Sequence, residues 1–240
     1  MIKKLLKPAR KLHKYLGYLL FLQILAWLLG GLVMSAIPLD KVHGNHLAKR
    51  TLSNPFIMSD YKADLNGIVS NADRPTSLSF SHFLDTPIIK LNGQQTKVFN
   101  GLTGTVLQPP TRSEIIQQAN AHLLIDAQVA AAVQLQQGAR EVGHRTHVWQ
   151  VTYDDMLSTT LYLDASSGEV ITVRSSLWRI FDFFWMLHIM DYQEREDFNN
   201  PLLISFAATS VLFALSGVLL LLQSPPRLGR RKSKKPTLKA

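Results

Sequence analysis

The chain has 240 residues, a net charge of +9 and no cysteine, which excludes disulfides, thiolate metal sites and cysteine nucleophiles. Residues 1–14 and 224–240 together hold half of the 26 basic residues and none of the acidic ones. Because each basic tail adjoins an apolar segment, retention on the cytoplasmic side of a membrane explains this charge. Nucleic-acid binding is therefore not expected.

Two uncharged apolar segments, residues 15–39 and 201–223, predict transmembrane helices. Each exceeds the roughly 20 residues that a helix needs to cross about 30 Å of hydrocarbon. A cleaved signal peptide is the alternative for the first segment, but its apolar run is far longer than the usual hydrophobic region of such peptides. The basic tails then predict a bacterial inner-membrane protein with both termini in the cytoplasm and its central region in the periplasm.

Small residues recur at intervals of three or four along the second segment. They allow the backbones of two helices to approach closely. This pattern predicts a tight helix pair, formed either within one chain or between two copies.

The central region predicts an antiparallel sheet with a helix. In residues 40–110, alternating strands near 78–83 and 87–91 precede the hairpin signal Asn92-Gly93. Thr111 and Glu114 then form a capping box that opens a helix, and further strands follow in residues 111–175. The fold class is a membrane α+β protein, in which two transmembrane helices flank this periplasmic domain.

Two turns in this region share one pattern. Asn100 is followed by Gly104 as Asp164 is followed by Gly168, and an apolar β-run leaves each turn. An Asx side chain can bond its own turn backbone, and the glycine can adopt positive φ. Their matched offset indicates a duplicated unit.

The second unit resembles the PepSY domain, through its capped helix, its strands and the ending Leu-Tyr-Leu-Asp164-Ala-Ser-Ser-Gly168-Glu-Val-Ile. The resemblance implies that residues 111–175 are a PepSY-like unit and residues 40–110 a degenerate first one. Two flanking motifs are similar to those of PepSY-associated transmembrane proteins: Leu12-His13 before Tyr15-Leu16-Gly17, and Leu187-His188 before Leu215-Ser216-Gly217. Longer members of that family have four or more spans.

The resemblance also implies haem as a cofactor, with His13, His43, His46 and His188 as candidate ligands and no other metal. The predicted topology puts His13 and His188 at opposite membrane faces, so they cannot share one iron. His188 could instead pair with His43 or His46, and His13 only with another chain. The alternative for each is an interfacial histidine with a packing role.

The sequence contains no metalloprotease, nucleophile-elbow, phosphate-loop or dinucleotide motif, so it is not expected to be an enzyme on its own. His144 and His147 are disfavoured as a metal pair, and Asp154-Asp155 is interpreted as a turn. Residues 177–192 predict an amphipathic helix on the periplasmic membrane surface. The alternative is a helix packed against the PepSY-like unit.

Two functions remain open. The first is an accessory or electron-transfer subunit of a membrane redox or iron-uptake system. The alternative is a non-enzymatic periplasmic module that binds or regulates, for example by restraining a peptidase or stabilising a membrane partner. The expected partners are the lipid bilayer and either a membrane protein or a second copy.

Overall fold

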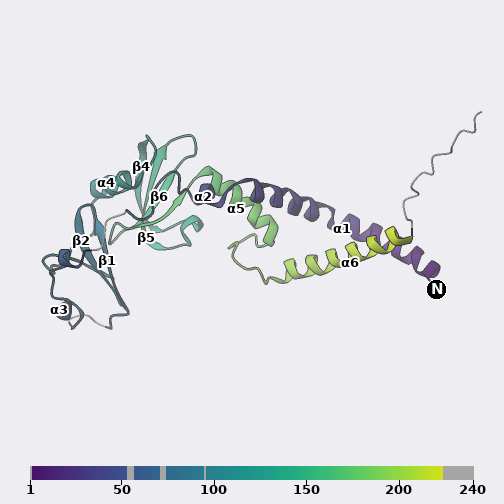
Figure 1. The fold of residues 1–240 in the computed structure, drawn as a ribbon, viewed down its shortest axis with the longest axis horizontal. Coiled ribbons are helices and arrows are strands. Elements are labelled where there is room, and N and C mark those ends of the chain that lie inside the picture. Colours follow the sequence, from purple (N-terminus) through teal and green to yellow (C-terminus); the bar gives the residue numbers. More distant parts are fainter. Residues whose placement is uncertain (1, 53–56, 71–73, 95, 224–240) are drawn as a thin grey trace, which may run out of the picture. The chain divides into compact units, whose positions relative to one another are not determined.

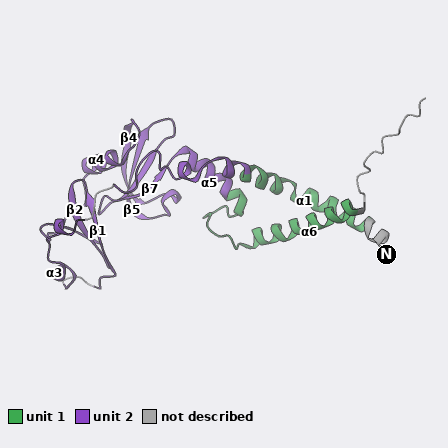
Figure 2. Ribbon diagram, viewed as in Figure 1, with its two compact units in different colours: residues 1–31, 186–240 green, residues 32–185 purple. Residues whose placement is uncertain are grey.

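The computed structural model describes residues 2–52, 57–70, 74–94 and 96–223 (Figure 1). The predicted basic tail 224–240 lies outside the described residues. The chain forms two compact units (Figure 2), which we call the helical unit, residues 1–31 and 186–240, and the sheet unit, residues 32–185. The first and fifth helices each have residues in both units.

The helical unit is built from two long helices, α1 (Ile2–Ala36) and α6 (Pro201–Gln223). Residues 2–14 of the predicted tail are thus the first turns of α1. The helix ends before Pro38, because a proline disfavours the helical conformation of the residue that precedes it. The short helix α2 (Leu39–Val42) then begins the path into the sheet unit.

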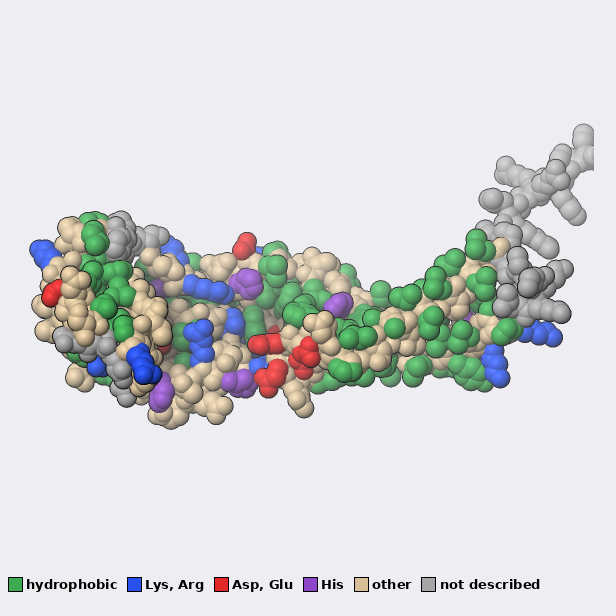
Figure 3. Space-filling view, turned by 90° about the horizontal axis from the view of Figure 1, so that it is seen from below, with side chains coloured by type: hydrophobic (Ala, Val, Ile, Leu, Met, Phe, Trp, Pro, Cys, Tyr) green, Lys and Arg blue, Asp and Glu red, His purple; other side chains and the backbone are tan. Residues whose placement is uncertain are grey.

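Two stretches of these helices, Lys7–Ala36 and Pro201–Leu222, are long and apolar enough to cross a membrane. Only 11% and 6% of their most apolar windows are buried inside the structure, so neither is the core helix of a soluble domain. Figure 3 shows apolar side chains covering this part of the molecule, with Lys and Arg side chains at one end. The two predicted segments are therefore confirmed as exposed apolar helices.

The first half of the sheet unit is a small antiparallel sheet. It contains η1 (Met58–Asp60), α3 (Leu65–Ser70), β1 (Ser77–Phe83), β2 (Thr86–Asn92) and β3 (Lys97–Asn100). The strand order is β1-β2-β3. One face of the sheet packs into a core made of Tyr61, Ile68, Ile89, Leu91 and Phe99.

The second half is a four-stranded antiparallel sheet with one helix. It contains α4 (Arg112–His122), β4 (Gln128–Gln137), η2 (Arg140–Val142), β5 (Thr146–Asp154), β6 (Thr160–Asp164) and β7 (Val170–Arg174), in the strand order β4-β5-β6-β7. The predicted capping box is confirmed: Thr111 accepts from the Glu114 amide, and the Glu114 side chain accepts from the Thr111 amide. The core between α4 and the sheet includes Ile115, Ala119, Trp149, Val151, Leu161 and Leu163.

The two turns that share a pattern also share a geometry. Gly104 and Gly168 have φ of 73° and 70°, and each donates its amide to the carbonyl of Asn100 or Asp164 at 2.9 Å. The Asx side chains accept from the amides two and three residues later. Both halves contain a helix followed by antiparallel strands, three in the first sheet and four in the second, and the duplication of one unit stays a prediction.

The second turn packs against the first sheet. Phe83, the last residue of β1, lies so close to Gly168 that a Cβ atom built on that glycine would be 2.1 Å from the phenyl ring. At Gly104 the nearest atom to such a Cβ is 3.4 Å away, on Ala63. Gly168 is therefore fixed both by its positive φ and by a close contact, whereas Gly104 is fixed by φ alone.

This difference predicts the outcome of a matched pair of substitutions. Gly104→Ala should lower the free energy of unfolding by about 1–2 kcal/mol, the cost of a side chain in the left-handed region. Gly168→Ala should cost about 2–4 kcal/mol, because the phenyl ring must also move. Urea unfolding of the full chain in detergent micelles, followed by tryptophan fluorescence, measures both. Equal costs would mean that the Phe83 contact contributes nothing.

Candidate functional site

A cleft of about 310 Å³ lies in the sheet unit, and residues of both halves line it. The first half contributes Tyr61 and the edge strand β1, and the second half contributes α4 and the start of β7. The segment 50–52 completes the wall. The lining residues include Arg50, Tyr61, Phe80, His82, Gln118, His122, Glu169 and Val170.

The wall combines apolar surface with a few polar groups. Phe80 packs edge-on against Tyr61, with ring centroids 5.0 Å apart, and the Tyr61 hydroxyl donates to the Ser81 carbonyl at 2.9 Å. Burial and the nearby Asp60 charge raise the pKa of Tyr61, so this hydroxyl stays protonated. Such a mixture of aromatic surface and a few polar groups is typical of ligand pockets.

One wall of the cleft is held by neutral hydrogen bonds. Gln118 accepts from the Leu84 amide at 2.8 Å and contacts His122 Nε2 through its own Nε2 at 3.1 Å. His122 Nδ1 lies 2.7 Å from the Lys49 carbonyl, so Nδ1 is the donor and Nε2 the acceptor. Burial lowers the pKa of His122, which favours this neutral form. The histidine thereby ties α4 to segment 47–50.

An ion-paired cluster joins the two sheets beside the cleft. Lys90 of β2 lies 3.0 Å from Glu169 and 3.7 Å from Asp164, and it also donates to Ser167 at 3.4 Å. Burial opposes the ionisation of both carboxyls, but hydrogen bonds and the Lys90 charge outweigh it, so the pKa values of Asp164 and Glu169 lie below their ordinary range. We call Lys90, Asp164, Ser167 and Glu169 the latch.

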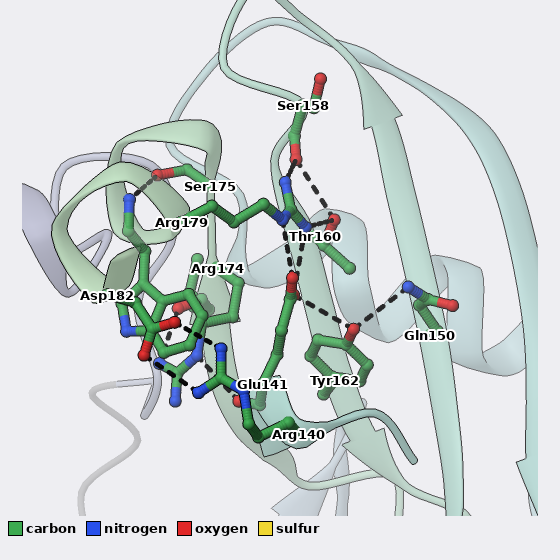
Figure 4. Close-up of polar contacts among 12 residues, drawn as sticks. Arg140, Glu141, Gln150, Ser158, Thr160, Tyr162, Arg174, Ser175, Arg179 and Asp182 are labelled. Carbon is green, nitrogen blue, oxygen red and sulfur yellow. Dashed lines mark hydrogen bonds and ion pairs between the residues drawn. The ribbon is translucent and has the colours of Figure 1, made fainter. Parts of the chain in front are cut away.

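A second charged cluster fixes the fifth helix, α5 (Ser176–Ile189), to the four-stranded sheet (Figure 4). Arg179 donates to Glu141 through Nε at 2.7 Å and through Nη2 at 3.1 Å. Arg140 Nη1 donates to Asp182 at 3.0 Å, and its Nη2 forms an ion pair with the same carboxylate. Arg179 and Asp182 of α5 are thus paired with η2.

Two more residues complete this second cluster. The Arg174 guanidinium lies 4.3 Å from the centre of the Trp178 ring, and its Nε donates to the Glu141 carbonyl. Burial and the like charge of Arg50 lower the pKa of Arg174 to about 10, which leaves it charged at neutral pH. Burial, with the Glu141 charge, raises the pKa of Tyr162 to about 12, so its hydroxyl donates to Glu141. The first half of α5 packs against the four-stranded sheet and η2, whereas its position at a membrane surface stays a prediction.

His13 lies between the two long helices of the helical unit. Its ring stacks on Phe213, with centroids 4.2 Å apart, and its Nδ1 lies 2.8 Å from the Ser216 hydroxyl. Because Ser216 donates to the Phe213 carbonyl, the His13 Nδ1–H is the donor to Ser216. A Cβ on Gly217 would be 3.1 Å from the His13 ring. The structure thus brings together two of the motifs that carry the family resemblance.

His188, near the C-terminal end of α5, lies beside Trp27 of α1. Its carbonyl accepts from Trp27 Nε1 at 2.9 Å, and its buried Nδ1 has no hydrogen-bond partner in the described part of the chain. Trp27 and His13 are separated by fourteen residues of one helix, which is about 21 Å. Two axial ligands of one haem iron must be about 4 Å apart. His13 and His188 of one chain therefore do not fit a shared haem.

The other candidate ligands lie in the sheet unit. His43 ends α2 and His46 follows in a turn, and both side chains are exposed. Their pairing with His188 stays a prediction. Within the described ranges, no group of three or more His, Asp or Glu side chains could hold a metal ion. Asp155 accepts from the amides of Leu157 and Thr159, so it is a turn residue, as expected.

Most of this site has no pattern in the sequence that could mark it. Arg50, His82 and Glu169 line the cleft, but they come from three separate segments and no spacing relates them. Gln23, in the helical unit, could have been singled out from the sequence, because it is the single strongly polar residue of an apolar run. Its side chain donates to the Leu187 carbonyl at 2.8 Å.

The latch predicts a pH dependence of stability. Since Asp164 and Glu169 have lowered pKa values in the folded chain, their contribution is complete at neutral pH and is lost as the pH falls below about 4. Glu169→Gln should lower the free energy of unfolding by about 1–2 kcal/mol at pH 7, and by less in acid. Urea unfolding of the full chain in micelles at several pH values measures this, with Asp85→Asn, an exposed turn substitution, as the control. A deficit that does not shrink in acid would contradict the prediction.

Comparison of the chain with protein-family models, with curated proteins and with solved structures finds no match. The resemblance to PepSY proteins therefore rests on the motifs of the chain itself.

Proposed function

We propose that this chain is a membrane-anchored accessory subunit whose PepSY-like sheet unit is a non-enzymatic binding module. The observation that carries the proposal is the cleft between the two sheets, whose lining combines aromatic and ionisable side chains. A latch and a neutral hydrogen-bond network hold these walls in place. A preformed concave site that combines apolar surface with a few polar groups is suited to binding a ligand.

The anchor follows from the helical unit. Its two long helices expose large apolar side chains such as Leu19, Leu22, Leu215 and Leu221, which water would solvate poorly. Lipid contact accounts for this exposure. With the basic termini on the cytoplasmic side, the sheet unit would face the periplasm of a bacterial inner membrane.

The lining of the cleft indicates the kind of ligand. Arg50 offers a cation, Glu169, which is paired with Lys90 in the latch, offers an anion, and Phe80 with Val170 offers an apolar surface. A short segment of polypeptide can offer an acidic group to Arg50, a basic group to Glu169 and apolar side chains to the surface formed by Phe80 and Val170. The proposed ligand is therefore a peptide segment of a partner protein, as in a module that restrains or stabilises another membrane protein.

Photo-crosslinking in cells tests the binding module. We expect p-benzoylphenylalanine at Phe80 or at Thr51, both in the cleft, to form a discrete adduct with a partner protein. The same group at Met156, which is 97% exposed on a distant turn, is the matched control. Arg50→Gln should weaken the adduct at least several-fold, because it removes the charge on one wall.

Two results would contradict the binding module. One is adducts of equal yield at Met156 and in the cleft, which would indicate random collision. The other is a cleft adduct that Arg50→Gln leaves unchanged while the variant is made in normal amounts.

A second candidate, electron transfer through haem, is favoured by one observation. His13 donates Nδ1–H to Ser216, which leaves Nε2 with its lone pair, and metal-bound histidines commonly have such a partner on their other nitrogen. His188 has a buried Nδ1 without a partner among the described residues. Either residue could hold an iron if the second ligand came from elsewhere. Haem would then supply a one-electron carrier to a redox or iron-uptake system.

The visible spectrum of the purified full chain tests this candidate. Protein produced with ample haem should show a Soret band, and His13→Ala or His188→Ala should remove it if that residue is a ligand. His144→Ala, at an exposed turn, is the control. A colourless protein that elutes as a folded species would exclude the haem form of the proposal and leave the binding module intact.

A further inference from the structure

The C-terminal end of α5 is hydrogen-bonded by side chains from elsewhere in the helical unit. Gln23 donates to the Leu187 carbonyl at 2.8 Å, and Trp27 donates to the His188 carbonyl at 2.9 Å. Asn200 donates to the Ile189 carbonyl at 2.9 Å. The last carbonyls of a helix have no hydrogen-bond partner within the helix, so each of these donors supplies a partner from outside it. The end of α5 therefore lies at the same position along the long helices as Trp27 and Asn200.

A strongly charged loop begins at that same level. The residues between α5 and α6 include four carboxylates, Asp191, Glu194, Glu196 and Asp197. The Asp191 carboxylate accepts from the amides of Glu196 and Asp197, and Asn200 donates to the Asp197 carbonyl at 2.8 Å. The loop is thus tied closely to the helix ends. Figure 3 shows acidic side chains gathered at the far end of the apolar helices from the Lys and Arg side chains.

Carboxylates and irregular backbone do not remain in hydrocarbon, where neither can be solvated. The loop must therefore lie in water or among lipid headgroups. Because hydrogen bonds fix the loop beside Trp27, the same boundary must cross α1 near that residue. A tryptophan whose indole N–H is hydrogen-bonded is also typical of the membrane interface.

We propose that the bilayer boundary crosses the helical unit at Trp27 and Asn200, so that α1 residues 28–36 emerge from the hydrocarbon as a continuous apolar helix. This inference rests on the proposed membrane anchor. It shortens the part of α1 that lies in hydrocarbon. The uncharged run 15–39 places the boundary near Pro38, whereas the hydrogen bonds place it more than two helical turns earlier.

The lengths of the two helices agree with this position. A hydrocarbon layer of about 30 Å corresponds to about 20 residues, which reaches from Trp27 back to Lys7. The span Pro201–Leu222, at about 33 Å, fits the same layer from Asn200. Lys11 and Lys14 then lie about 6 Å and 10 Å inside the opposite boundary, and their long apolar stems let the ammonium groups extend toward the headgroups.

Cysteine accessibility tests the boundary, and the chain is suited to it because it has no cysteine of its own. Single cysteines replace Leu32 and Ser35 above the proposed boundary, and Leu19 and Leu22 below it, all at exposed positions of α1. Tyr192→Cys in the loop is the positive control. The full-length variants are reconstituted in phospholipid nanodiscs, where both membrane faces are open, and treated with a charged, membrane-impermeant maleimide.

We expect cysteines at 32 and 35 to react within a few-fold of the rate at 192, and those at 19 and 22 at least about tenfold more slowly. Slow reaction at 32 and 35, together with slow reaction at 19 and 22, would overturn the boundary at Trp27 but retain the anchor. Fast reaction at all four positions would overturn the membrane anchor itself, and with it this inference.

Discussion

The helical unit depends on the need to satisfy backbone carbonyls at the end of a helix that is surrounded by apolar side chains. Three of these carbonyls, on Leu187, His188 and Ile189, accept from Gln23, Trp27 and Asn200. Asn200 also accepts from the Leu203 amide, so one side chain ends α5 and begins α6. The single strongly polar residue of the first apolar segment thus has a defined structural task.

The sheet unit depends on a different contact, the packing of one turn against the neighbouring sheet. The turn from Asp164 to Gly168 meets Phe83 through a glycine and meets Lys90 through its carboxylate. The cleft lies beside this contact, and Glu169 belongs to both. The shape of the cleft and the pairing of the two sheets are therefore properties of the same few residues.

Local patterns allowed much of the fold to be predicted. The capping box at Thr111 and the Asp164 turn were correct because each depends on residues a few positions apart. The Asn-Gly signal did not give a two-residue turn, since β2 ends at Asn92 and β3 begins at Lys97. The tight turn lies instead at Leu84-Asp85, where Leu84 has a φ of 51° that its side chain does not predict.

The candidate site was harder to predict, because its residues meet only through tertiary packing. The structure keeps His13 and His188 apart, although His188 lies beside Trp27 and not beyond the end of α1. The separation of these two histidines is shorter than the predicted topology implied, but it is still several times the roughly 4 Å between two ligands of one iron. The cleft residues Arg50 and Glu169 had no local pattern that could mark them.

Each of the two sheets has a face that another element covers. The first sheet receives the Asp164 turn on the face that carries Lys90 and Val98, and the matching face of the second sheet carries Gln150 and Tyr162. That face is covered by Val142 and by the Glu141 cluster that holds α5. The ion pairs that hold α5 therefore lie over the second sheet, as the Asp164 turn lies over the first.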